Sequence, residues 1–374
     1  MEFSLNETQA DIRDRARRFS DEELRPLARQ RDQTGEFPLD SFRKMAELGL
    51  MGVNVDKAYG GLGAGVVAYS LAVSEIARGD ASVAVTMAVN NMVAEVIQAF
   101  GTEDQRRAYI PRLTSGEFSS GSFCLSEPGS GSDAASLLTR AVRCEEGWRI
   151  TGSKAWITSG TYAGVFLVWA KAANDAGEEL ISLFLVDPAL DGVTIGKPEK
   201  KMGQHASNTV PISFDGVIVP EDAVLGEVGE GFKIAMMALD GGRVGIASQA
   251  LGIGLEALSL VREHALDGKT VNEDKLAEMA TELEAARQLT MRAAWLKELG
   301  TRRFSREASM AKLFSTDAAW RAANETVHLL GGKGYTTDTL AEKLLRDVRV
   351  TKIYEGTNEI QRIVIARDLT RYGY

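Results

Sequence analysis

Cysteine and histidine are scarce in this 374-residue sequence, which has two cysteines, Cys124 and Cys144, and three histidines. Neither residue type shows the close spacing that metal ligands need, so the sequence predicts no metal site. Two cysteines cannot build a disulfide framework either. Cysteine–histidine nucleophile chemistry is therefore poorly supported.

Long apolar runs and excess positive charge are also missing. No stretch approaches 18 uninterrupted apolar residues, so the sequence predicts no membrane span. The first residues carry acids and lack the apolar core of a signal peptide, and we expect a cytoplasmic protein. The formal net charge of -9 argues against nucleic acid or an anionic membrane as a partner.

Composition divides the chain into three parts and predicts an α+β multidomain fold. Residues 1–117 carry apolar residues at helical spacing and predict an all-α N-terminal domain. Residues 118–227 contain short β-rich stretches such as GVFLVWAKA, which predict a small antiparallel sheet domain of sandwich or barrel type. Residues 228–374 return to helical spacing and predict a C-terminal four-helix bundle.

Two segments of the β-rich part could hold a planar or anionic group. LSEPGSGSDAAS, residues 125–136, offers hydroxyls and backbone N–H donors in a glycine-rich loop. In AWITSG, residues 155–160, Trp156 and Thr158 should lie on one side of a strand, suited to stacking on a ring and to hydrogen bonding with it. Taken alone, a plain turn and a tryptophan in the sheet core are the simpler interpretations.

The C-terminal part contains a charged pair and a glycine-rich segment. Asp240 and Arg243 lie one turn apart in a stretch of small apolar residues, so each needs a partner, either the other or a ligand. The glycines of HLLGGKGY, residues 328–335, would let the backbone approach a bound group closely.

The segment KIYEGTNEIQRI, residues 352–363, contains a carboxylate that a helix start does not explain. Thr357 can cap a helix, but a cap requires neither Glu355 nor Gly356 before it. Taken alone, Glu355 is most simply a solvated loop carboxylate.

Six segments together resemble the acyl-CoA dehydrogenase family, in family order and almost from end to end. They are CLSEPGSGSDAAS, KAWITSG, KMGQHASNTVPISFDGVIVPEDAVLG, GEGFKIAMMALDGGRVGIASQALGIG, HLLGGKGY and IYEGTNEIQRIVIAR. The resemblance implies a helical, a β and a four-helix-bundle domain with FAD between them, in a homotetramer or dimer. AVNNMVAE and YEGTNEIQR look most like short-chain or butyryl-CoA members, which act on short or lightly branched acyl groups.

The resemblance gives Glu355 the role of general base. It would remove the α-proton of an acyl-CoA thioester while the β-hydrogen leaves as hydride to flavin N5, giving the trans-2-enoyl-CoA. Burial against an acyl chain would raise the pKa of the carboxylate and make it a stronger base. Gly356 would leave room for the thioester carbonyl to reach the Glu355 N–H. Electron-transfer flavoprotein is the implied acceptor.

The resemblance also assigns the other site residues. Trp156 would stack near the flavin and Thr158 would hydrogen-bond close to N5. The implied cofactor-binding set is Leu125, Ser126, Gly131, Ser132, Trp156, Thr158, His328, Gly331, Gly332 and Thr357. The implied substrate-binding set is Ser132, Asp240, Arg243, Glu355 and Gly356. The segment 328–332 would lie near residues 355–357 and meet the ribityl, pyrophosphate or adenosine part of FAD.

Two features distinguish this sequence from those of some or most relatives: the residue at position 242 and the length of the connection 263–280. Some relatives carry the base at the place of Gly242, and a glycine cannot serve. The connection 263–280 is shorter than usual, with His264 near the place of an arginine and no glutamine, which predicts fewer FAD contacts across subunits.

Two alternative functions stay open: an acyl-CoA oxidase, and a non-catalytic binding or assembly protein of the same fold.

Overall fold

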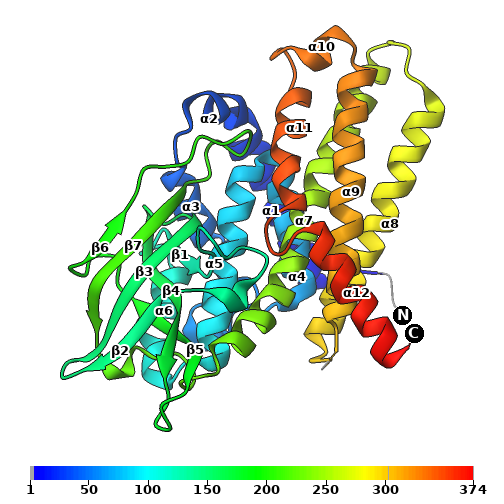
Figure 1. The fold of residues 1–374 in the computed structure, drawn as a ribbon. Coiled ribbons are helices and arrows are strands. Elements are labelled where there is room, and N and C mark those ends of the chain that lie inside the picture. Colours follow the sequence, from blue (N-terminus) through cyan, green and yellow to red (C-terminus); the bar gives the residue numbers. More distant parts are fainter. Residues whose placement is uncertain (1–3, 302, 374) are drawn as a thin grey trace.

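The N-terminal part is helical in the computed structural model, which describes residues 4–301 and 303–373 (Figure 1). Asn6 and Thr102 each begin a helix through a capping box with the glutamine three residues later. Two further helices, α4 and α5, are buried on most of their surface and form the centre of this part. The helices are α1 (Glu7–Phe19), α2 (Ala28–Thr34), α3 (Leu39–Glu47), α4 (Gly65–Gly79), α5 (Ala81–Phe100) and α6 (Glu103–Thr114).

The middle part is one seven-stranded sheet in the order β1-β4-β2-β3-β7-β6, with β5 also paired to β4. Strand β4 pairs in parallel with β1 and β2, and the remaining pairings are antiparallel. The expectation of a purely antiparallel sheet is therefore wrong, because apolar alternation does not encode the direction of pairing. The strands are β1 (Ser120–Cys124), β2 (Arg140–Cys144), β3 (Gly147–Thr158), β4 (Ala163–Ala173), β5 (Glu179–Val186), β6 (Val193–Ile195) and β7 (Thr209–Val219).

Strand β4 is buried on both faces, which explains its uninterrupted apolar sequence. Phe166 and Val168 pack with side chains of β3 and β7 in the core of the sheet domain. Leu167 and Trp169 point to the opposite face and pack with α5 and α7. The sheet is thereby fixed against both helical parts.

The C-terminal part is a helix bundle in which α7, α8 and α9 are long and α11 is the shorter fourth member (Figure 1). The link between α7 and α8 is residues 267–272, and the Asn272 side chain accepts a hydrogen bond from the Lys275 N–H at 3.1 Å. The helices are α7 (Gly231–Leu266), α8 (Glu273–Glu298), α9 (Ser305–Leu329), α10 (Gly332–Tyr335), α11 (Ala341–Arg349) and α12 (Asn358–Tyr372).

Two helices, α5 and α7, are long and apolar enough to cross a membrane by length and composition alone. Most of each is covered by the rest of the chain, with 72% and 78% of their most apolar windows buried. Core helices pass the same test, so this is weak evidence for a span.

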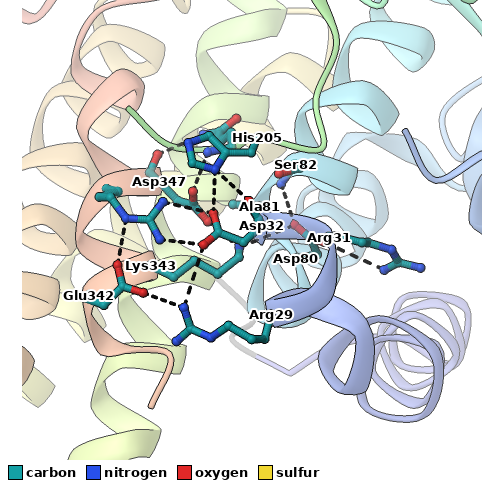
Figure 2. Close-up of polar contacts among 12 residues, drawn as sticks. Arg29, Arg31, Asp32, Asp80, Ala81, Ser82, His205, Glu342, Lys343 and Asp347 are labelled. Carbon is teal, nitrogen blue, oxygen red and sulfur yellow. Dashed lines mark hydrogen bonds and ion pairs between the residues drawn. The ribbon is translucent and has the colours of Figure 1, made fainter. Parts of the chain in front are cut away.

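Charged side chains join the N-terminal part to the bundle and to the loop before β7 (Figure 2). Asp32 of α2 accepts hydrogen bonds from Arg346 of α11 at 2.6 and 2.9 Å. The His205 ring lies 3.1 Å from the same aspartate. Lys343 pairs with Asp347 at 2.5 Å, one turn farther along α11.

The loop before β7 also contacts the residue that precedes Glu355. The Gln204 side chain donates to the Asp347 carbonyl at 2.9 Å and to the Tyr354 hydroxyl at 3.3 Å. Tyr354 donates in turn to Gln249 of α7. Gln249 also donates to the Ala81 carbonyl of α5 at 2.8 Å, so all three parts of the chain meet beside the turn that carries Glu355.

Candidate active site

Glu355 lies in the turn between the 3-10 helix η7 (Val350–Lys352) and α12. Its φ is +54°, and Gly356 follows with φ of +82°, so two consecutive residues are left-handed. A non-glycine residue pays for this conformation in steric strain, and such residues gather at functional sites. The described part of the chain contains three others, Trp156, Ser159 and Gln204, and Gln204 contacts the Tyr354 hydroxyl beside this turn.

The carboxylate of Glu355 points inward against α7, although the residue as a whole is half-buried. Its Oε2 is buried and has no hydrogen-bond partner among the described residues. A Cβ placed on Gly242 would come within 2.8 Å of the Glu355 Cδ and 3.2 Å of the Met92 Sδ. Only a glycine at position 242 leaves space for this carboxylate. A larger side chain at position 242, such as the base expected there in some relatives, would occupy the space that the Glu355 carboxylate fills here.

Burial raises the pKa of Glu355 to about 7, and the positive charges of Arg243 and Lys312 oppose this rise. A carboxyl group with this pKa is substantially ionised near neutral pH and is a far better proton acceptor than a solvated carboxylate. The solvated-loop interpretation of Glu355 is therefore wrong.

Two buried side chains hold the Glu355–Gly356 turn. Lys312 of α9 donates from Nζ to the Gly356 carbonyl at 2.9 Å and to Asn358 Oδ1 at 2.9 Å. Gln361 of α12 donates from Nε2 to the Glu355 carbonyl at 3.2 Å and to the Gly356 carbonyl at 2.8 Å. Sequence reasoning missed both, and the only local signal was a lysine among small residues in ASMAKLF.

Thr357 caps α12, since its hydroxyl accepts a hydrogen bond from the Ile360 N–H at 3.3 Å. This confirms the interpretation of Thr357 as a helix cap. The cap begins the helix directly after the turn and leaves the Glu355 carboxylate outside it.

Asp240 and Arg243 of α7 find their partner in each other, at 2.5 Å. Ser305 of α9 donates to the aspartate, and Ser309 lies 3.4 Å from the guanidinium. Burial raises the pKa of Asp240. The Arg243 Nε is buried and finds no acceptor in the part of the chain that the structure describes. The charge of Arg243 therefore favours the ionised form of Glu355, and its Nε–H remains available to donate a hydrogen bond to a ligand.

A buried ion pair between Lys154 and Glu127 holds the glycine-rich loop, residues 125–136, against β3. Lys154 is fully buried and donates to Glu127 at 2.8 Å and to the Leu125 carbonyl at 3.2 Å. Glu127 also accepts from the Thr139 hydroxyl at 2.6 Å. Burial opposes ionisation of Glu127, but these donors outweigh it and lower its pKa. Both charged residues lie inside the segments singled out by sequence, and their pairing was not foreseen.

The predicted residues of this loop have different surroundings. The side chain of Leu125 is buried in the core with α5 and α7, so only its backbone can face a cofactor. The Ser126 carbonyl accepts from the Ala155 N–H at 2.9 Å. Gly131 and Ser132 lie exposed at the loop tip.

Trp156 projects from β3 with 64% of its surface exposed. Its φ of +62° marks a break in the register of β3 with β7, so simple alternation does not apply there. The sheet-core interpretation of Trp156 is therefore wrong. Thr158 is half-buried, and its carbonyl accepts from the Ser122 hydroxyl at 2.7 Å.

His328, Gly331 and Gly332 do not lie near Glu355 within one chain. His328 lies in the last turn of α9, sixteen residues beyond Lys312 or roughly 24 Å along the helix axis, and Gly331 and Gly332 come after the helix ends. All three are exposed, and a Cβ on either glycine would meet nothing within 4 Å. The expected proximity to residues 355–357 is therefore wrong within one chain, because Lys312 of α9 contacts Gly356 while His328 lies at the other end of the same helix.

Comparison with known proteins fits this arrangement. Family models for the N-terminal, middle and C-terminal domains of acyl-CoA dehydrogenases match residues 6–117, 122–217 and 229–370. An acyl-CoA dehydrogenase of Bacillus subtilis is 45% identical over 98% of both chains. The chain belongs to the acyl-CoA dehydrogenase family. The short-chain specific mitochondrial acyl-CoA dehydrogenase of Homo sapiens is 43% identical over 98% of this chain and 91% of its own.

Solved structures of acyl-CoA dehydrogenases share the whole architecture. Butyryl-CoA dehydrogenase from Megasphaera elsdenii superposes with a TM-score of 0.94 at 37% identity, covering 99% of this chain and all of its own. A chain of a structure described as the electron transferring flavoprotein of Acidaminococcus fermentans gives 0.95 at 38%, with the same coverage. These full-length matches to enzymes set aside the non-catalytic alternative.

Acyl-CoA dehydrogenases are FAD-dependent, and a similar glutaryl-CoA dehydrogenase from Mycobacterium smegmatis (29% identity, TM-score 0.92, 99% of this chain and 96% of its own) was solved with FADH2. The residues of this chain fit such a group. Trp156 presents an exposed ring beside the loop of Ser126, and a Cβ on Gly129 or Gly131 of that loop would meet nothing within 4 Å. An aromatic face and an open glycine-rich backbone suit a flavin ring and its polar edge.

Proposed function

We propose that this acyl-CoA dehydrogenase oxidises short-chain or lightly branched acyl-CoA thioesters to trans-2-enoyl-CoA, with Glu355 as the general base. One observation carries the proposal: Glu355 Oε2 is buried and lacks a hydrogen-bond partner among the described residues, and burial raises the pKa of this carboxyl group to about 7. A carboxylate left unpaired in a packed interior is costly unless it serves a ligand.

The reaction removes a proton from the α-carbon and a hydride from the β-carbon. Glu355 Oε2 accepts the proton, and the positive charges of Arg243 and Lys312 favour its ionised form against the effect of burial. FAD, when bound, supplies the acceptor for the hydride. The space over Gly242 lets the carboxylate approach the substrate without an intervening side chain.

The likeness to short-chain specific enzymes and to a butyryl-CoA dehydrogenase supports a short acyl group. Anaerobic titration with acyl-CoAs from four to sixteen carbons, followed by loss of flavin absorbance, measures this preference. We expect bleaching at the lowest concentration with four to six carbons. A preference for twelve or more carbons would refute the substrate class and leave the role of Glu355 untouched.

Electron-transfer flavoprotein is the proposed acceptor, and the likeness to a chain in such a structure supports it. Turnover with that protein should be fast, and peroxide formation in air slow. Fast peroxide formation without it would identify an oxidase. We also propose a homotetramer or dimer, as the family resemblance implies, which light scattering of the FAD-loaded protein tests.

The substitution Glu355→Gln tests the base directly. It keeps size and polarity but removes basicity, so flavin reduction by butyryl-CoA should slow by about 10²–10⁴-fold. The flavin spectrum and the binding of crotonyl-CoA should remain close to those of the parent. Glu284→Gln is the matched control, because Glu284 is an exposed carboxylate on α8 that pairs with Arg287 at 2.7 Å. A Glu355→Gln rate within about threefold of the parent would refute the assignment.

A further inference from the structure

The buried ammonium of Lys312 lies directly behind the turn that carries Glu355. Lys312 has no exposed surface, and its Nζ donates to the Gly356 carbonyl and to Asn358 Oδ1, both at 2.9 Å. Asn358 is itself fixed by α9, since its side chain donates to Thr316 and Asp317 at 3.0 Å. Burying a lysine amine is unfavourable, so the contacts that it makes there must compensate.

Gln361 approaches the same turn from the other side. It is fully buried, and its Nε2 donates to the carbonyls of Glu355 and Gly356 at 3.2 and 2.8 Å. Both carbonyls of the left-handed pair are therefore held by interior donors that belong to two different helices. A left-handed glutamate persists only where its surroundings enforce it.

We propose that Lys312 and Gln361 are positioning residues for the reaction: they hold the Glu355–Gly356 turn, and Lys312 also places a positive charge near the Glu355 carboxylate. This inference rests on the proposed role of Glu355 as the base. Gln361 can fix the turn but carries no charge, so the two residues separate geometry from electrostatics.

The positive charge of Lys312 lowers the pKa of Glu355, and a few other ionisable groups lie close to both residues. The pKa of Lys312 is itself lowered to about 7 by burial, and the Glu355 carboxylate opposes this fall. Loss of this charge should raise the pKa of Glu355 further, because an opposite charge nearby favours the ionised form. The groups that face the pair are Arg243 from α7, Tyr69 from α4, Asp317 from α9 and Glu359 from α12.

The test compares Lys312→Met and Gln361→Met in the FAD-loaded protein. Anaerobic stopped-flow reduction by butyryl-CoA is measured from pH 5.5 to 9, and crotonyl-CoA binding is titrated separately. Lys275→Met is the control, because Lys275 makes an exposed ion pair with Glu278 at 2.8 Å on α8. We expect the control to match the parent in rate, midpoint and binding.

The two variants should both lose rate, but only Lys312→Met should shift the pH at half-maximal rate. A misplaced base should slow reduction by about 10–100-fold in both, while crotonyl-CoA binding changes by less than about threefold. The pH at half-maximal rate should rise by about one pH unit or more in Lys312→Met and stay within about 0.3 in Gln361→Met.

A double variant that combines Lys312→Met with Glu355→Gln tests this inference separately from the role of Glu355. If Lys312 acts through Glu355, adding Lys312→Met to Glu355→Gln should leave the rate within about threefold of Glu355→Gln alone. Equal losses in both backgrounds, or a parental rate and midpoint in Lys312→Met, would overturn the proposal. A parental rate in Glu355→Gln overturns the base instead. If Lys312→Met does not fold, a parental rate in Gln361→Met refutes the positioning of the turn, and a slowed rate supports it.

Discussion

Replacing Gly242 with alanine adds one methyl group at the point where α7 meets the Glu355 carboxylate. The new Cβ would lie 2.8 Å from the Glu355 Cδ and 3.2 Å from the Met92 Sδ. Ordinary contacts between carbon atoms are about 3.5–4.0 Å, so the carboxylate must retreat by roughly 0.7–1.2 Å. The backbone at Gly242 is helical and accepts alanine without strain.

The magnitudes predict a loss of rate with little loss of stability. Alanine in place of glycine favours the helix by about 1 kcal/mol. Overpacking costs about 1–3 kcal/mol, so the net change in the free energy of unfolding should be a loss of about 0–2 kcal/mol. A displacement of about 1 Å at the reacting group costs on the order of 10²-fold in rate. Catalysis should therefore suffer far more than folding.

Anaerobic stopped-flow reduction by butyryl-CoA measures the rate, and urea unfolding measures the stability. Gly254→Ala is the matched control on the same helix, because its Cβ would lie 2.5 Å from the Leu283 Cδ2 and 3.2 Å from the Ala319 Cα, with no carboxylate involved. It should lose stability by overpacking and keep the parental rate within about threefold. A Gly242→Ala protein that reduces its flavin as fast as the parent would contradict the placement of Glu355 against Gly242.

Four further outcomes follow from the charged groups. The rate of flavin reduction should rise with pH through about 7 as Glu355 ionises, and a midpoint near 4.5 would contradict its burial. Because the folded pKa of Glu355 is raised, its ionisation destabilises the fold as pH rises from 4.5 to about 7, so the unfolding free energy of Glu355→Gln should exceed that of the parent increasingly over this range. Lys154→Met leaves Glu127 buried without its cation and should cost about 3–5 kcal/mol in urea unfolding and weaken FAD retention; a loss below about 1 kcal/mol would count against the pair as the anchor of the loop. Asp32→Asn should cost about 2 kcal/mol by removing the charge that pairs with Arg346, which keeps its ion pair with Glu342 at 2.7 Å. The pKa of Asp32 is lowered by Arg346 against the effect of burial, so this stabilisation is present above pH 3.8 and should disappear as pH falls through the folded pKa; an acid-independent difference in unfolding free energy would contradict this.

The sequence by itself determined the order of the three parts and singled out Glu355 as the proposed base. Helical periodicity and capping are local properties, so the caps at Asn6, Thr102 and Thr357 follow from a few neighbouring residues. A helix start left Glu355 unexplained, and the resemblance of six segments to the acyl-CoA dehydrogenase family gave this carboxylate the role of base. These features depend on short stretches of chain, and a single sequence contains them in full.

Only the tertiary structure decided how the base is held and what surrounds it. Lys312 lies 43 positions from Glu355 in sequence and Gly242 lies 113, and no local pattern brings either to the carboxylate. The parallel pairings of β4 and the distance from His328 to the site were likewise invisible, because strand direction and helix placement come from packing between distant segments. The raised pKa of Glu355 has the same origin. Burial is a property of the assembled interior, and it raises the pKa of an otherwise ordinary glutamate to about 7.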